Sequence, residues 1–170
     1  MAEDGQVEEI DLAGATTFDE VESRFLGAVT DDMYVSLNKS DTEEILDEVL
    51  IEALPWFRTP RGKNILDYDR EGRKFKCYLD ELEIQIIVKY MTMVWVQRQL
   101  FTIDLIKQKY TGSDFSMTSQ ANHIGKLITL KQEAEREGDH LQSNYYRYEK
   151  DEHGVYRTTL YKLLERPRWK

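Results

Sequence analysis

The sequence predicts a mainly α-helical protein, a helical bundle built on two long helices with a small β-hairpin near the C-terminus. Apolar residues recur every three or four positions over several long stretches, which is the spacing of one helical face. The chain has only 3 prolines and 9 glycines in 170 residues, so long helices meet few interruptions. Hydrophobic residues make up 41% and charged residues 32%, a balance typical of one globular domain with a well-solvated surface.

We expect two short helices in the N-terminal third, over residues 17–28 and 41–54. A hydroxyl residue stands at the start of each and is followed three positions later by glutamate, so both side chains can satisfy free backbone amides. These capping pairs are Thr17 with Glu20 and Ser40 with Glu43. Pro55 ends the second helix, because proline has no amide hydrogen and disfavours helical geometry in the residue before it.

Two longer helices are expected over residues 81–110 and 117–146. The first is preceded by Asp80, a favoured cap residue, and followed by Gly112, which readily adopts the left-handed conformation found at helix ends. Its apolar residues form two stripes, and a helix that is apolar on two sides is either central in the fold or lends one side to another subunit. The second helix has Gly138 on its apolar stripe, which a close approach of another helix would explain.

Residues 55–78 form an irregular, basic loop between the helices. They contain seven basic side chains and three acidic ones, and we expect one short strand near residues 73–78. Three interpretations stay open: a solvated loop, a surface that docks onto an acidic partner such as the acidic third of a neighbouring copy, or a nucleic-acid-binding surface. Aromatic and arginine side chains are favoured anchors in interfaces. The candidate partner-binding residues of the loop are Trp56, Phe57, Arg58, Arg61 and Lys63.

The C-terminal segment changes character after residue 146. Tyrosines on both sides of a polar turn at residues 151–154 predict a β-hairpin, and a continued helix followed by a tail is the alternative. The last five residues either form a docking peptide or fray in solution. The candidate partner-binding residues there are Arg166, Arg168, Trp169 and Lys170. We therefore divide the chain into an acidic flexible tail (1–15), a helical domain (16–148) and a C-terminal extension (149–170).

Charge is distributed unevenly along the chain, whose net charge is −9. Residues 1–54 contain 16 acidic residues against Arg24 and Lys39, a net charge of −14. Residues 55–170 contain 21 basic residues against 16 acidic ones, a net charge of +5. Such asymmetry is typical of interaction proteins, because an acidic region repels nucleic acid and attracts basic protein surfaces. A solvated acidic face without a specific role is the alternative.

No residue pattern indicates an enzyme, a metal site or a cofactor site. The single cysteine, Cys77, excludes an internal disulfide and a thiolate cluster, and it favours synthesis in a reducing cytoplasm. The histidines His123, His140 and His153 do not have metal-binding spacing, and the glycines form no phosphate-binding motif. The acidic N-terminus lacks the apolar stretch of a signal peptide, and we expect no membrane-spanning segment.

Several segments share features with a known family. They read LPWF at 54–57, LDELEIQII at 79–87, WVQRQ at 95–99, KQKYTGSDF at 107–115 and TSQANHI at 118–124. On these segments the chain resembles the head-to-tail connector proteins, also called neck or adaptor proteins, of tailed phages with low-GC Gram-positive hosts. The shared segments are packing and capping motifs, so the resemblance brings no catalytic residues with it.

The resemblance implies a structural role without cofactors. Connectors of this kind form a homo-oligomeric ring, typically of twelve copies, between the portal protein and the tail or stopper protein. DNA passes through the ring without specific binding. The chain would be made in the host cytoplasm and become part of the virion neck. The alternative is a small acidic regulatory protein that mimics DNA and inhibits a host nucleic-acid enzyme, which the acidic residues of 1–54 favour and the basic remainder does not.

Overall fold

The computed structural model describes residues 14–29, 39–58, 60–109, 117–150 and 155–158. Within these ranges the fold is mainly α-helical, as the sequence predicts. Its four α-helices are α1 (Phe18–Ala28), α3 (Lys39–Ala53), α4 (Glu81–Lys109) and α5 (Met117–Arg147), and a short 3-10 helix, η2 (Leu54–Trp56), follows α3.

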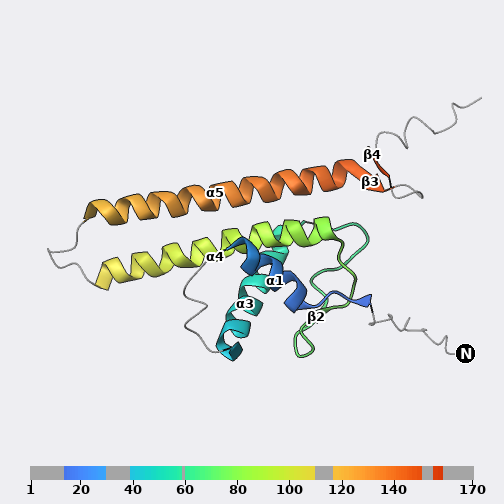
Figure 1. The fold of residues 1–170 in the computed structure, drawn as a ribbon, viewed down its shortest axis with the longest axis horizontal. Helices are drawn as coiled ribbons and strands as arrows, with labels where there is room; N and C mark the ends of the chain where they lie inside the picture. Colours follow the sequence, from blue (N-terminus) through green and yellow to red (C-terminus); the bar gives the residue numbers. More distant parts are fainter. Residues whose placement is uncertain (1–13, 30–38, 59, 110–116, 151–154, 159–170) are drawn as a thin grey trace, which may run out of the picture.

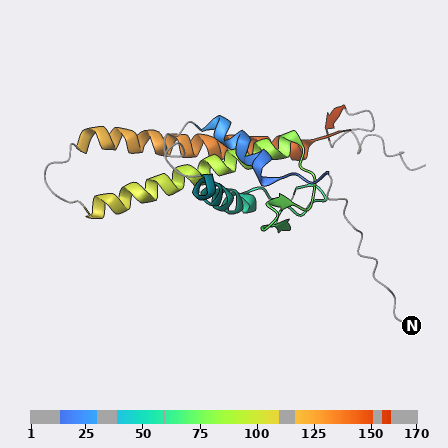
Figure 2. The same cartoon turned by 60° about the horizontal axis from the view of Figure 1, so that its bottom comes forward.

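The helices pack in three layers, with α4 between α5 on one side and α1 with α3 on the other (Figure 1). The two long helices, α4 and α5, run antiparallel. After the rotation in Figure 2, α1 and α3 still lie beside only one half of α4. The molecule therefore has a thick body and a thinner projecting arm. We call residues 99–109 of α4 and 117–131 of α5 the arm, and the other described residues the body.

The core of the body is built around α4. From Ile84 to Val96 nearly every apolar side chain of this helix is buried, on both of the stripes that the sequence predicts. A helix can be apolar nearly all round when other elements cover every side of it, as α1, α3 and α5 do here. The helices α1 and α3 contribute Phe18, Val21, Phe25, Leu46, Val49 and Leu50 to the same core.

Two of the predicted helix caps are confirmed. At α1, the Thr17 hydroxyl accepts the N–H of Glu20 at 3.3 Å. At α4, the N–H of Glu83 donates to Asp80 Oδ1 at 2.9 Å, and the Glu83 carboxylate accepts the N–H of Asp80 at 2.8 Å. Helix α3 begins two residues earlier than expected, so the predicted cap Ser40 lies inside its first turn.

Gly138 confirms the close approach of the two long helices. A Cβ atom at this position would lie 2.9 Å from Tyr90 Cε1, which is too close for van der Waals contact. Tyr90 cannot easily move aside, because its ring stacks on Trp56 and its hydroxyl donates to Asp139 Oδ1 at 2.9 Å. The body therefore needs a glycine here, whereas a Cβ atom at Gly125 of the arm would have nothing within 4 Å.

The basic loop contains a β-hairpin where the sequence predicts only a single strand. Strand β1 (Tyr68–Asp69) pairs antiparallel with β2 (Lys74–Phe75). The Asp69 carboxylate closes the turn by accepting the N–H of Gly72 at 3.0 Å, and Arg73 takes a left-handed backbone with φ of 47°. Strands of two residues are too short to produce the alternating pattern by which hairpins are predicted.

A second hairpin follows α5. Strand β3 (Tyr148–Lys150) pairs antiparallel with β4 (Tyr156–Thr158). This is the segment for which the sequence left a hairpin and a continued helix open. Residues 151–154 between the two strands lie outside the described part of the chain, as do residues 1–13 and 159–170, which make up most of the two predicted terminal segments.

Candidate partner-binding site

The first half of the basic loop is fastened to the C-terminal end of α5. The backbone N–H of Arg58 donates to Gln142 Oε1 at 2.6 Å, and that of Arg61 donates to the Tyr145 hydroxyl at 3.0 Å. The Arg61 guanidinium also donates to the backbone carbonyl of Tyr145 and, at 2.7 Å, to that of Tyr148. The last carbonyls of a helix have no partner within the helix, so Arg61 completes the end of α5.

Lys63 is held by a buried carboxylate at the start of α4. Its Nζ donates to Glu83 Oε2 at 2.5 Å, and the Tyr145 hydroxyl donates to Glu83 Oε1 at 2.8 Å. Glu83 is only 1% exposed, and these two donors offset the cost of burying its charge. Burial, together with the hydrogen bond to Glu83, raises the pKa of Tyr145 above its ordinary value. The cavity of about 210 Å³ beside these side chains is lined by charged groups that already have partners.

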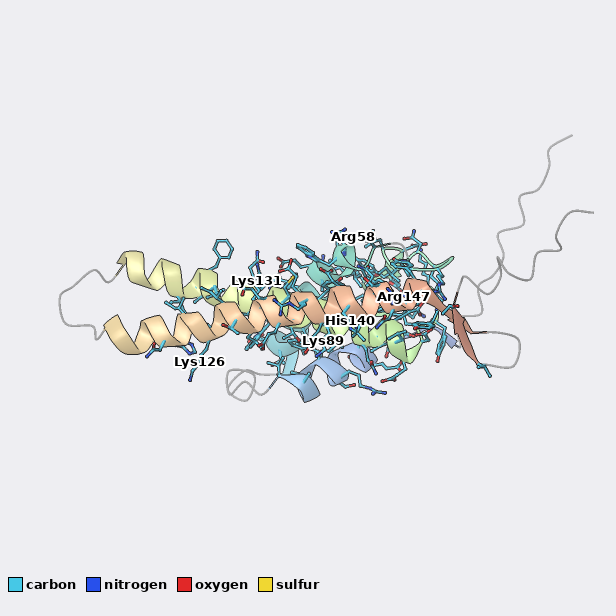
Figure 3. The ribbon with its side chains drawn as sticks, turned by 90° about the horizontal axis from the view of Figure 1, so that it is seen from above. Arg58, Lys89, Lys126, Lys131, His140 and Arg147 are labelled. Atoms are coloured by element: carbon cyan, nitrogen blue, oxygen red, sulfur yellow. The ribbon has the colours of Figure 1, made fainter. Side chains whose placement is uncertain are left out.

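The five candidate residues of the loop do not form one exposed surface. Phe57 is 3% exposed and packs edge-on against a tyrosine of α5. Together with Arg61 and Lys63, it stabilises the subunit itself. Trp56 is 38% exposed, and the side chain of Arg58 is exposed to solvent. Figure 3 shows Arg58 at the outer edge of the body, beside the C-terminal half of α5.

Arg58 and Lys63 line a groove of about 550 Å³ in this part of the loop. The floor of the groove is apolar and buried, and it includes Leu54, Phe57 and Ile65. The exposed residues that line it are Pro55, Arg58, Gly62, Asn64 and Leu66. In the part of the chain that the structure describes, the Arg58 side chain has no ion-pair partner, so the groove keeps a free positive charge. We call this feature the loop groove.

Sequence reasoning missed the apolar part of the loop groove. The adjacent apolar residues Ile65 and Leu66 could have indicated it. In a polar loop, however, an apolar residue can be either buried or exposed, and the sequence does not tell which. The structure shows that Ile65 is 2% exposed and Leu66 56% exposed. The candidate residues of the C-terminus lie outside the described part of the chain, and they are Arg166, Arg168, Trp169 and Lys170.

The second half of the basic loop is tied to the body through Arg73. Its guanidinium donates to Asp19 at 2.7 Å, to Glu22 at 2.8 Å and to Asp47 at 3.1 Å, which joins the β1–β2 hairpin to α1 and α3. Burial and a hydrogen bond with Asp47 raise the pKa of Glu22 to about 8, in spite of the nearby arginine. Glu22 therefore keeps its proton at neutral pH. We call these four side chains the Arg73 cluster.

Arg98 marks the boundary between the body and the arm. Its guanidinium donates to Glu48 at 3.0 Å and to Glu52 at 2.8 Å, both on α3. Beyond this point α5 is the only described element that lies beside α4 (Figures 1 and 2). The arm extends about 16 Å past Arg98, since a helix rises 1.5 Å per residue and α4 ends at Lys109.

The arm exposes large apolar side chains. Phe101 is 64% exposed, Ile128 42% and Leu130 39%. Two lysines, Lys126 and Lys131, also lie on the arm, as Figure 3 shows. Among the side chains that the structure describes, neither lysine has an ion-pair partner. Over its whole sequence the arm has four lysines and one acidic residue, Asp104. The arm thus combines exposed apolar side chains with an excess of positive charge.

The helices α1 and α3 form an acidic face on the body. Together they contain nine acidic residues against Arg24 and Lys39. Arg73 and Arg98 share six of these carboxyl groups, which are Asp19, Glu22, Glu43, Asp47, Glu48 and Glu52. Two arginines cannot neutralise six carboxyl groups, and Glu20 and Glu44 are exposed in addition. The face therefore keeps an excess of negative charge.

No family model, curated protein or solved structure matches the chain. Within the described residues, no three side chains of His, Cys, Asp or Glu are grouped so that they could hold a metal ion. None of the helices that the structure describes combines the length and apolar character needed to cross a bilayer. The fold is a helical bundle with a projecting arm, and its function has to be inferred from its surfaces.

Proposed function

We propose that the chain is a structural subunit that assembles with copies of itself, the arm of one copy packing against the acidic face of the next. The observation that carries this proposal is the exposed apolar surface of the arm. Burying one large apolar side chain contributes about 1.5–3 kcal/mol, so Phe101, Ile128 and Leu130 together represent a substantial driving force for association. A projecting element that carries several such side chains is typical of an interaction site.

The two surfaces are complementary in charge. Lys126 and Lys131 bring positive charge to the arm, while α1 and α3 carry an excess of carboxylates. Because the arm and the acidic face are different surfaces, the contact is head-to-tail. Repeated head-to-tail contacts generate a closed ring when the rotation between neighbours closes. A ring is also the assembly that the resemblance to head-to-tail connectors implies.

We further propose that this ring is a connector of a tailed-phage neck, between the portal protein and the tail or stopper protein. The support is the resemblance carried by residues 54–57 and 80–148. An acidic surface facing the channel would let DNA pass without binding, because like charges repel. On this proposal the ring contains about twelve copies, as the resemblance implies.

The oligomeric state of the full chain tests the assembly. In size-exclusion chromatography with light scattering, we expect an oligomer whose population falls as salt rises, because salt screens the attraction between exposed charges. A Phe101→Glu variant should be monomeric. The matched control is Tyr78→Glu, since Tyr78 in the basic loop is also 64% exposed, and it should assemble like the wild type. A wild-type monomer at all concentrations, or an oligomeric Phe101→Glu variant, would contradict the proposal.

Charge reversal identifies the partner surface. A Lys126→Glu variant should assemble more weakly than the wild type, because it places a carboxylate opposite the acidic face. Adding Glu44→Lys on α3 should restore part of the affinity, and Glu44→Lys alone should weaken assembly. If the second reversal restores nothing, the arm contacts a surface other than α3.

The neck assignment is tested by a tagged pull-down from infected or expressing cells, analysed by mass spectrometry. Near-stoichiometric recovery of a portal or tail protein is the expected result. Recovery of a host polymerase or nuclease without virion proteins would favour the regulatory alternative. That alternative has weaker support, since a DNA mimic presents free carboxylates, and six of the nine carboxyl groups on α1 and α3 already contact Arg73 or Arg98.

A further inference from the structure

The loop groove has no role in the proposed assembly through the arm. It combines a buried apolar floor with the exposed side chain of Leu66 and with the cationic side chains of Arg58 and Lys63. Lys63 is paired with Glu83, and Arg58 has no ion-pair partner among the described residues. A volume of about 550 Å³ accommodates several side chains of a peptide. The matching ligand is a peptide in which apolar side chains alternate with carboxylates.

We propose that residues 3–12 of the same chain occupy the loop groove. This segment reads EDGQVEEIDL and contains five acidic residues and no basic one. Val7, Ile10 and Leu12 supply apolar side chains between the carboxylates. The other terminal segment, residues 159–170, is a poorer match, because it has four basic residues and one acidic residue and would be repelled by Arg58.

The segment begins from a point close to the loop groove. Thr16 is bonded to the strand of chain that precedes α4, since its N–H donates to the Cys77 carbonyl at 3.3 Å and its hydroxyl accepts the N–H of Leu79 at 2.8 Å. Between these two residues, Tyr78 lies against Lys63, whose Nζ is 5.8 Å from the ring centroid. Lys63, which lines the groove, therefore contacts Tyr78, the residue between the two to which Thr16 is bonded.

Reach and proximity both favour an intramolecular contact. An extended chain covers about 3.3 Å per residue, so residues 3–12 can reach up to about 33 Å. A tethered ligand also has an effective concentration on the order of millimolar, so even a weak contact is occupied. The segment then covers Leu66 and neutralises Arg58, and any partner that uses the groove has to displace it.

Photo-cross-linking of the full chain tests this contact directly. The variant Leu66→p-benzoylphenylalanine places the probe on an exposed side chain of the groove, where the change leaves the core intact. After irradiation, mass spectrometry of the monomeric band should find cross-links to residues 3–12. The matched control carries the same probe at Phe101 on the arm, which is 64% exposed and should give no cross-link to that segment.

Charge reversal tests the chemistry of the contact. An Arg58→Glu variant keeps the backbone N–H that donates to Gln142, so the loop should remain folded, and its melting temperature and circular dichroism check this. We expect the cross-link yield from Leu66 to fall about tenfold, which corresponds to 1.4 kcal/mol. Adding Glu8→Lys and Glu9→Lys should restore it. The proposal is overturned if the probe at position 66 cross-links to residues 159–170, to a second copy or to nothing. It is also overturned if the cross-link yield is the same in the Arg58→Glu variant.

Discussion

The body and the arm contain the same two helices, α4 and α5, in different surroundings. In the body, α1 and α3 cover the side of α4 that α5 leaves open, and Ile87 and Met91 are completely buried. In the arm, α5 alone among the described elements covers α4, and Phe101 is 64% exposed. The comparison shows that the body buries its apolar side chains in one core, whereas the arm leaves large apolar side chains in contact with water.

The Arg73 cluster should show the largest effect in the body. Arg73→Ala leaves the Asp47 carboxylate without its cation, and it leaves the protonated carboxyl group of Glu22, which is 3% exposed, without its hydrogen-bond donor. Breaking a buried ion pair by removing one partner costs about 3 kcal/mol, and urea denaturation measures the loss in the free energy of unfolding. The control is Arg98→Ala at the start of the arm, whose exposed pairs should cost about 1 kcal/mol or less. Equal losses would show that the cluster does not hold the body together.

The same cluster should make stability depend on pH. The pKa of Glu22 is about 8 in the folded protein and its ordinary value is 4.5, so the folded state binds this proton more tightly than the unfolded state. The protonated Glu22 carboxyl group therefore makes its full contribution to the free energy of unfolding below pH 4.5. This contribution is lost as the pH rises through 8. The melting temperature should fall over this range. A Glu22→Gln variant has no proton to lose there and should show a flatter profile; identical profiles would assign the titration to another group.

One substitution at two glycines should have opposite effects in the two regions. Gly138→Ala in the body places Cβ against Tyr90 and should lower the free energy of unfolding by about 1–2 kcal/mol. Gly125→Ala in the arm meets nothing within 4 Å and should raise it by up to about 1 kcal/mol, because alanine favours the helix. Thermal unfolding measures both. Stabilisation by both variants would mean that the helices do not approach closely at Gly138.

The smallest effect on stability is expected at the exposed apolar side chains of the arm. Phe101→Ser should change the free energy of unfolding of the monomer by no more than about 0.5 kcal/mol, because the side chain is largely in water already. Denaturation at low protein concentration, where association is absent, provides this measurement. A loss above about 2 kcal/mol would place Phe101 in the core and erase the distinction between arm and body.

Local spacing was enough to predict the helices but not the contacts of the basic loop. The sequence identified both long helices to within one residue at each end, because their apolar pattern and their caps are properties of neighbouring residues. It treated Arg61 and Lys63 as partner-binding residues, whereas the structure places them against the end of α5 and the start of α4. The sequence does not show which side chain will bond to a given helix end, because that depends on how the helices pack against the loop.

The sequence by itself determined the α-helical class, the caps at Thr17 and Asp80 and the two apolar sides of α4. These features follow from residues one to four positions apart along one helix. Only the tertiary structure decided which charges pair inside the subunit, as those of Arg73 and Arg98 do, and which stay exposed without an ion-pair partner among the described residues, as that of Arg58 does. The Arg73 guanidinium donates to Glu22, which is 51 residues away in the sequence. This contact depends on how the β1–β2 hairpin, α1 and α3 pack together.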